Sequence, residues 1–231
     1  MMKHQKITIA GIPAVLWCDD ADKLYIHVHG KMSQKEYAAE FAEIAAEKGY
    51  QTLSFDLPEH GERKNEPDRC DIWTGMRDLK NIADWAFARY KSVSLFGCSL
   101  GAYFSLQTYA GLPFARCLFQ SPILDMEYLV RQMMLWFDIT EERLEQEKEI
   151  DNPVDPLRWD YFQFVRTHPV TYWPIPTAIL YGGKDDLQSR AVMDTFCAAH
   201  GCTLTVSETS GHAFMENGDG AIIRNWLKEN I

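Results

Sequence analysis

The sequence predicts an α/β protein with a mostly parallel sheet covered by helices on both faces. Short apolar runs alternate along the chain with longer segments whose apolar residues recur at helical spacing. The length of 231 residues, 46% of them hydrophobic, suits one domain spanning residues 1–231. Polar residues whose side chains can take part in catalysis or ligand binding repeatedly follow the ends of expected strands. In such sheets, ligands bind at the edge where the strands end.

The N-terminal half alternates between the two patterns. Two short strands flank Gly11-Ile12-Pro13, which indicates a hairpin-like start. The expected strands are 6–10, 14–18, 24–29, 51–55 and 93–96, and the expected helices are 34–48, 75–90 and 100–110. Residues 62–74 are polar and are expected to form a loop.

The C-terminal half keeps this alternation except in one long stretch. Strands are expected at 116–120, 177–181 and 203–207, with helices at about 188–200 and around Ile222, Ile223, Trp226 and Leu227. Residues 123–173 contain helical stretches rich in aromatic and charged residues but no clear strand.

Composition excludes several classes of partner. A net charge of −10 argues against binding to nucleic acid or to an anionic membrane surface. We see no signal peptide and no apolar stretch long enough to span a bilayer. The six cysteines form no C-x-x-C pair, which favours reduced thiols in a cytoplasmic protein over a zinc site.

The segment Gly97-Cys98-Ser99-Leu100-Gly101 joins an expected strand directly to an expected helix. Such a tight turn strains the backbone of Ser99 and needs small neighbours, which the two glycines provide. Ser99 then lies at a helix N-terminus, where free N–H groups favour developing negative charge. A serine so placed is a candidate nucleophile.

A serine hydroxyl needs an adjacent base, usually histidine, and the histidine needs a carboxylate to fix its tautomer. The chain offers these groups in the order Ser99, Asp185, His212, each at or after the end of an expected strand. The topology therefore predicts that the three converge at one edge of the sheet.

Over nearly its whole length the chain resembles the α/β-hydrolase superfamily. The segments that carry the resemblance are His27-Val28-His29-Gly30, Asp56-Leu57-Pro58-Glu59-His60-Gly61, Gly97-Cys98-Ser99-Leu100-Gly101, Tyr181-Gly182-Gly183-Lys184-Asp185-Asp186 and Ser210-Gly211-His212. The resemblance implies a sheet of about eight strands with an antiparallel start. It also implies a helical lid inserted after the strand that follows the serine, which matches residues 123–173.

The resemblance also implies a role for each member of the triad. It makes Ser99 the nucleophile, His212 the base and Asp185 the acid, with Asp186 and Asp125 as alternative acids. Cys98, beside the serine, is interpreted as a packed thiol rather than a rival nucleophile. His29 and His60 belong to His-Gly turns, and we expect them to fix loops by hydrogen bonds.

The oxyanion hole is expected to use two backbone N–H groups, those of Leu100 and Lys31, with Met32 as an alternative to Lys31. The sequence His-Gly-Lys-Met departs from the His-Gly-Gly-Gly form of some lipases and esterases. This departure argues against activity on esters of tertiary alcohols.

The expected activity is hydrolysis of a small or medium carboxylic ester through an acyl-enzyme on Ser99, with no metal or organic cofactor. Thioesterase, amidase, peptidase or C–C hydrolase activity on the same triad stays open, because fold does not fix substrate. A non-catalytic binding protein is the alternative of another class. Among the aromatic residues of 123–173, Trp136 and Trp159 are the candidate walls of an acyl pocket, and the oligomeric state is left open.

Overall fold

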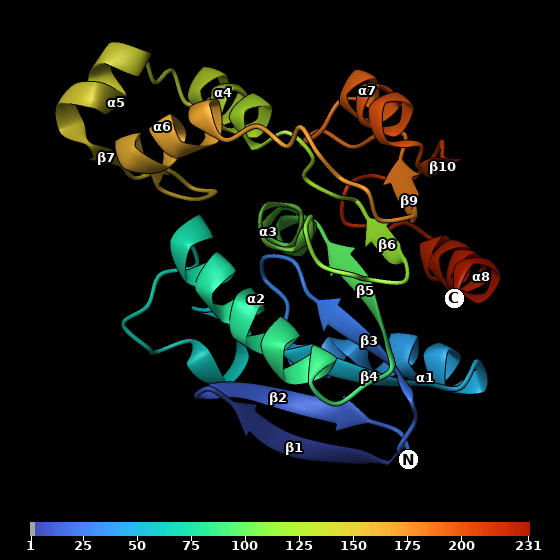
Figure 1. Ribbon diagram of the computed structural model, residues 1–231. Coiled ribbons are helices and arrows are strands. Elements are labelled where there is room, and N and C mark those ends of the chain that lie inside the picture. The colour runs from blue at the N-terminus through green and yellow to red at the C-terminus, as the bar shows by residue number, and fades with distance from the viewer. Residues whose placement is uncertain (1–2) are drawn as a thin grey trace.

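The computed structural model describes residues 3–231, and an eight-stranded sheet lies at its centre (Figure 1). Its strands are β1 (His4–Ile9), β2 (Ile12–Trp17), β3 (Lys23–Val28), β4 (Tyr50–Phe55), β5 (Ser92–Cys98), β6 (Cys117–Gln120), β9 (Thr177–Gly182) and β10 (Thr203–Ser207). They lie in the order β1-β2-β4-β3-β5-β6-β9-β10. β2 is antiparallel to both β1 and β4, and all other pairs are parallel, which confirms the expected antiparallel start.

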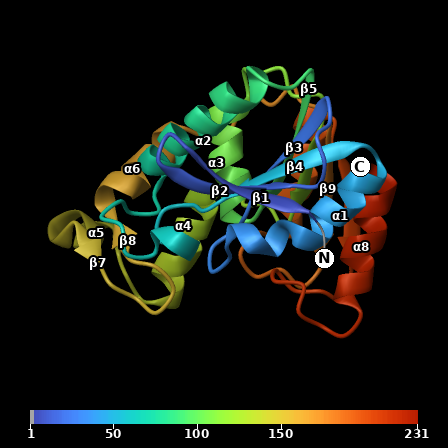
Figure 2. The same ribbon diagram turned by 90° about the horizontal axis from the view of Figure 1, so that it is seen from below.

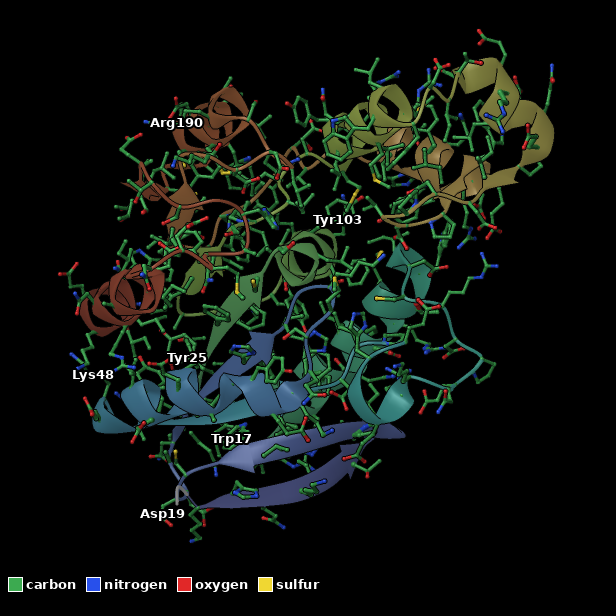
Figure 3. All side chains as sticks on the ribbon, turned by 180° about the vertical axis from the view of Figure 1, so that it is seen from behind. Trp17, Asp19, Tyr25, Lys48, Tyr103 and Arg190 are labelled. Atoms are coloured by element: carbon green, nitrogen blue, oxygen red, sulfur yellow. The ribbon has the colours of Figure 1, made fainter. Side chains whose placement is uncertain are left out.

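Helices cover both faces of the sheet, as Figure 2 shows from below. The helices of this body are α1 (Ala39–Glu47), α2 (Ile72–Phe87), α3 (Leu100–Tyr109), α7 (Arg190–His200) and α8 (Asp219–Asn230), with short 3-10 turns at Lys35–Ala38 and Gly61–Arg63. α1 and α8 pack on one face of the sheet, the face on which Tyr25 of β3 lies (Figure 3). There the ring of Tyr25 meets that of Phe41 on α1 edge to face, with centroids 5.2 Å apart. α2 and α3 pack against each other on the other face.

One helix, α2, begins earlier than its apolar pattern indicates. α2 starts at Ile72 rather than at 75, because the side chain of Asp71 accepts a hydrogen bond from the amide of Thr74 and forms a capping box with it. The last three residues of the expected loop 62–74 therefore belong to this helix. The cap satisfies amide groups that would otherwise have no partner.

Residues 123–173, which we call the cap, follow β6 and precede β9 in the sequence. They lie over one end of the body (Figure 1). The cap contains α4 (Met126–Trp136), α5 (Glu141–Glu147), β7 (Glu149–Ile150), β8 (Leu157–Arg158) and α6 (Trp159–Thr167). β7 and β8 form a two-stranded antiparallel sheet, so the expectation of no strand here is wrong. Strands of two residues are too short to show an alternating pattern.

Two further features bear on the sequence-based expectations. No helix within residues 3–231 is long and apolar enough to cross a bilayer. In the same part of the chain, no two cysteines form a disulfide.

Candidate active site

Ser99 occupies the single-residue turn between β5, which ends at Cys98, and α3, which begins at Leu100. Its backbone is left-handed, with φ 49° and ψ −116°, a conformation that costs a non-glycine residue about 1–3 kcal/mol. The helix packs so closely on β3 that a Cβ atom on Gly101 would lie 2.4 Å from the carbonyl oxygen of His29. Only glycine fits there.

Two hydrogen bonds join Ser99, His212 and Asp185 in a chain. Ser99 Oγ lies 2.8 Å from His212 Nε2, and His212 Nδ1 lies 2.7 Å from Asp185 Oδ2. Because the ionised carboxylate can only accept, Nδ1 carries the proton, and Nε2 accepts from the serine hydroxyl. The imidazole is thus held in the tautomer that can take a proton from Ser99.

Asp185 is fixed by further contacts. Its side chain is fully buried, and its Oδ1 accepts hydrogen bonds from the amides of Leu187 and Gln188 at 2.8 and 3.1 Å. These bonds hold the carboxylate in place and leave Oδ2 facing the histidine. Of the three candidate acids, Asp185 is therefore the one that lies beside His212.

The other two candidate acids lie elsewhere. Asp186 is exposed to solvent. Asp125 is also exposed and caps α4, its Oδ1 accepting from the amide of Tyr128 at 2.8 Å. Neither carboxylate is hydrogen-bonded to the histidine.

The loop that carries His212 is anchored by two serine side chains whose anchoring role was not expected from the sequence. Ser121, buried at the end of β6, donates its hydroxyl hydrogen to the backbone carbonyl of His212 at 2.7 Å. Ser210 donates to the buried carboxylate of Asp219 at 2.5 Å and lies 2.6 Å from the hydroxyl of Ser207. The only signal for Ser121 in the sequence was its place directly after a strand.

Two segments with candidate backbone N–H donors lie next to Ser99, the start of α3 and the loop after β3. Leu100 is the first residue of α3, so its N–H has no intrahelical acceptor. The loop after β3 passes close by, since a Cβ atom on Gly30 would lie 3.1 Å from the Cβ of Ser99. In this loop the Met32 amide donates to His60 Nε2 at 3.0 Å, which removes Met32 from the candidate oxyanion donors and leaves Lys31.

No family model and no curated protein sequence matches the chain. Solved structures do match. Est1E from Butyrivibrio proteoclasticus with ferulic acid bound has a TM-score of 0.79 at 18% identity, over 97% of this chain and 96% of that one. Mouse alpha/beta hydrolase domain-containing protein 10 has a TM-score of 0.78 at 14% identity, over 98% and 97% of the two chains. This chain has the α/β-hydrolase fold. An esterase from Pyrococcus furiosus is also similar, with a TM-score of 0.67 at 18% identity, over 99% and 88%.

In this α/β-hydrolase fold, a cavity of about 440 Å³ opens beside Ser99 between the body and the cap. One wall is the apolar face of α4, whose four lining residues recur at helical spacing: Met126, Leu129, Val130 and Met133. Cys70, Leu157 and Tyr161 also line the cavity. The cavity is of the size and apolar character typical of small-molecule sites.

Trp136 and Trp159 were expected at this cavity, but neither is among the described residues that line it. Trp136 lies at the end of α4 with 43% of its surface exposed. Trp159 packs on Phe162, with ring centroids 6.1 Å apart. The expectation that these two side chains wall the pocket is therefore wrong, because the face of α4 that turns toward Ser99 carries aliphatic and methionine side chains instead.

Ion pairs between body and cap surround the cavity. They are Lys31 with Asp155, Arg69 with Glu149 at 2.9 Å, and Asp71 with Arg158 at 2.9 Å. The Lys31 ammonium group therefore contacts the cap, whereas its backbone amide belongs to the loop beside Ser99.

Two other observations concern the chemistry of the site. Burial raises the pKa of the Cys98 thiol to about 12, so this thiol stays protonated at neutral pH and packs as an apolar group. Within residues 3–231, no three histidine, cysteine or carboxylate side chains gather in a way that could hold a metal ion.

Proposed function

We propose that this protein is a serine hydrolase that cleaves small or medium carboxylic esters through an acyl-enzyme on Ser99. The observation that carries the proposal is the hydrogen-bonded chain from Ser99 Oγ through His212 to Asp185, with distances of 2.8 and 2.7 Å. It lies at a strained strand-to-helix turn and beside an apolar cavity. The esterases among the similar structures agree with this proposal.

The proposed reaction assigns one step to each group. Ser99 Oγ attacks the ester carbonyl carbon while His212 Nε2 takes the hydroxyl proton, and Asp185 stabilises the imidazolium that forms. The N–H groups of Leu100 and Lys31 hold the tetrahedral oxyanion. His212 then returns the proton to the leaving alcohol, and a water molecule activated by the same imidazole releases the acid from Ser99.

The cavity supports an apolar acyl group as the part of the substrate that lies under the cap. The residues of α4 that face Ser99 include two methionines, whose flexible thioether chains adapt to differently shaped ligands. Each of the three cations around the cavity is paired with a carboxylate, which disfavours an anionic acyl group.

A fluorophosphonate probe tests the proposal directly. We expect the probe to label the wild type and not Ser99→Ala, because only a serine activated by its histidine reacts at an appreciable rate. Absence of labelling in the folded wild type would favour the non-catalytic binding protein.

The substrate class is then measured with p-nitrophenyl esters of increasing acyl length, with matched thioesters and anilides beside them. A feruloyl ester joins this panel because the similar Est1E structure holds ferulic acid. The proposal predicts the highest kcat/KM on an oxygen ester. Faster turnover of thioesters or anilides would instead indicate a thioesterase or an amidase that uses the same three residues.

A further inference from the structure

Two histidine rings bridge the loops that follow β3 and β4 in a reciprocal arrangement. His29, on the first loop, accepts a hydrogen bond at Nε2 from the amide of Leu57 on the second loop, at 3.1 Å. His60, on the second loop, accepts at Nε2 from the amide of Met32 on the first loop, at 3.0 Å. The two rings meet edge to face with centroids 5.1 Å apart.

The other nitrogen of each ring contacts a backbone carbonyl of the ring's own loop. His29 Nδ1 lies 2.7 Å from the oxygen of Gly30, and His60 Nδ1 lies 2.7 Å from the oxygen of Pro58. A carbonyl can only accept and an amide N–H can only donate. Each ring must therefore be neutral with its proton on Nδ1, so the backbone contacts alone assign the tautomer of both.

These contacts fix the two peptide planes on either side of Lys31. The Gly30 carbonyl and the Lys31 N–H belong to one planar, trans peptide, so the bond from His29 to this carbonyl also sets the direction of the N–H. The next peptide contains the Met32 N–H, which His60 holds. The Lys31 backbone is thus held at both ends by an imidazole ring.

We infer that His29 and His60 are positioning residues that aim the Lys31 amide at the oxyanion of the reaction on Ser99. The inference rests on the proposed function, and it adds two residues that touch neither the substrate nor the reacting atoms. A preorganised donor stabilises the transition state because no free energy is spent on turning it toward the oxygen during the reaction. The negative charge on the carbonyl oxygen is absent in the bound ester and develops in the transition state, so the benefit appears in kcat rather than in KM.

The surroundings suit a rigid support. His29 is 1% exposed and His60 9% exposed. Beneath them, the buried carboxylate of Asp56 accepts from the Lys35 ammonium group at 2.6 Å and from the Lys35 amide at 2.9 Å. The second loop is therefore anchored independently of the two rings.

The kinetic test uses His29→Ala and His60→Ala on the best ester found for the wild type. We expect kcat to fall by about ten- to a hundredfold, below the loss on deleting an oxyanion donor outright, with KM within about twofold of wild type. An aryl boronic acid, which adds Ser99 Oγ to form a tetrahedral anion, should lose affinity in proportion to kcat.

The matched control is His27→Ala, because His27 is also buried on β3 but its ring packs on Phe41 and Phe96 instead of on the loops. We expect His27→Ala to lower the stability of the protein and to leave kcat near the wild-type value. If His29→Ala and His60→Ala likewise keep kcat and boronic acid affinity while Ser99→Ala is inactive, the inference is overturned and the proposed function stands. If the wild type neither turns over esters nor reacts with the fluorophosphonate, the proposed function itself fails.

A second measurement needs no variant to be active. In the ¹⁵N-labelled wild type, the ring nitrogens of His29 and His60 should show neutral rings with the proton on Nδ1 at neutral pH. The His60 signals are assigned by their loss in His60→Ala. A ring protonated on Nε2, or a charged ring, would overturn the inference.

Discussion

The hydroxyl of Ser121 donates a hydrogen bond to the backbone carbonyl of His212, with 2.7 Å between the two oxygens. Ser121 directly follows β6, which lies between β5 and β9 in the sheet, whereas His212 lies in the loop after β10. This bond ties the base to the centre of the sheet. A buried serine that follows a different strand thus helps to fix the position of the imidazole.

Ser121→Ala should lower kcat several-fold and lower the free energy of unfolding by about 1 kcal/mol, the usual net contribution of one hydrogen bond. Ser54→Ala is the matched control, since Ser54 is also buried and donates to the carbonyl of Lys35 at 2.8 Å. Steady-state kinetics and urea unfolding of both variants separate the two effects. Equal kcat losses in both would mean that Ser121 acts only through stability.

Ser99→Ala and His212→Ala should each reduce kcat by on the order of 10⁴ to 10⁶, and the double variant should lose no more than either single one. The reason is that nucleophile and base work as one unit through the 2.8 Å bond. The three proteins are compared on one ester with their folding checked by circular dichroism. Losses that multiply in the double variant would contradict the pairing.

Asp185→Asn should reduce kcat by on the order of 10⁴, because an amide would allow the wrong tautomer of the histidine. Asp186→Asn and Asp125→Asn should cost little, since the first side chain is exposed and the second caps α4. The three variants differ by the same chemical change and are measured side by side. A large loss in Asp125→Asn with a normal Asp185→Asn would reverse the assignment.

Met133→Ala should enlarge the cavity and shift chain-length preference toward longer acyl groups, by about tenfold in the ratio of kcat/KM for a long over a short p-nitrophenyl ester. Leu135→Ala is its control, because Leu135 lies two residues further along α4 but is 74% exposed. If Met133→Ala leaves this ratio unchanged and lowers the melting temperature, Met133 contributes to packing and not to substrate choice.

Folding stability should fall as the pH falls from about 6.5 toward 3. Burial is the main cause that lowers the pKa of His27 to about 3 and of His29 to about 4, and the neighbouring His29 also disfavours a charged His27. His60 and Lys35 also disfavour a charged His29, whereas Asp56 favours it. The unfolded chain therefore binds more protons in this window, and stability rises with pH across it.

Urea unfolding at several pH values checks this prediction, with His27→Phe as the comparison. The phenyl ring keeps the stacking on Phe96 but has no group to protonate. Its stability should depend less on pH than that of the wild type. A parallel dependence in both proteins would remove His27 as a source of the acid sensitivity.

Much of the body could be predicted from local pattern. The strand before Ser99, the turn and the helix after it all follow from residues close together in sequence, and the order of strand ends brought Asp185 and His212 to the same edge. The expected loop-fixing role of His29 and His60 followed from their position before glycine, and both rings do hold loop backbone.

The remaining features depend on tertiary contacts. Aromatic residues in the cap indicated a pocket wall, but which face of α4 turns toward Ser99 is set by packing, and Trp136 turns away. Nothing in the residues around Ser121 indicates that its hydroxyl reaches a carbonyl 91 positions further along the chain. Likewise, Met32 could be removed as a candidate oxyanion donor only because the structure shows that its amide donates to His60.

The cap leaves the sheet after β6 and returns at β9, and these two strands are hydrogen-bonded neighbours, with Cys117 paired to Thr177. Ser99, Asp185 and His212 all lie outside this segment. One contiguous stretch of the gene can therefore be exchanged or can diverge while the strand order is kept. Changes in the cap can therefore alter the apolar wall of the cavity while the three hydrogen-bonded residues keep their places.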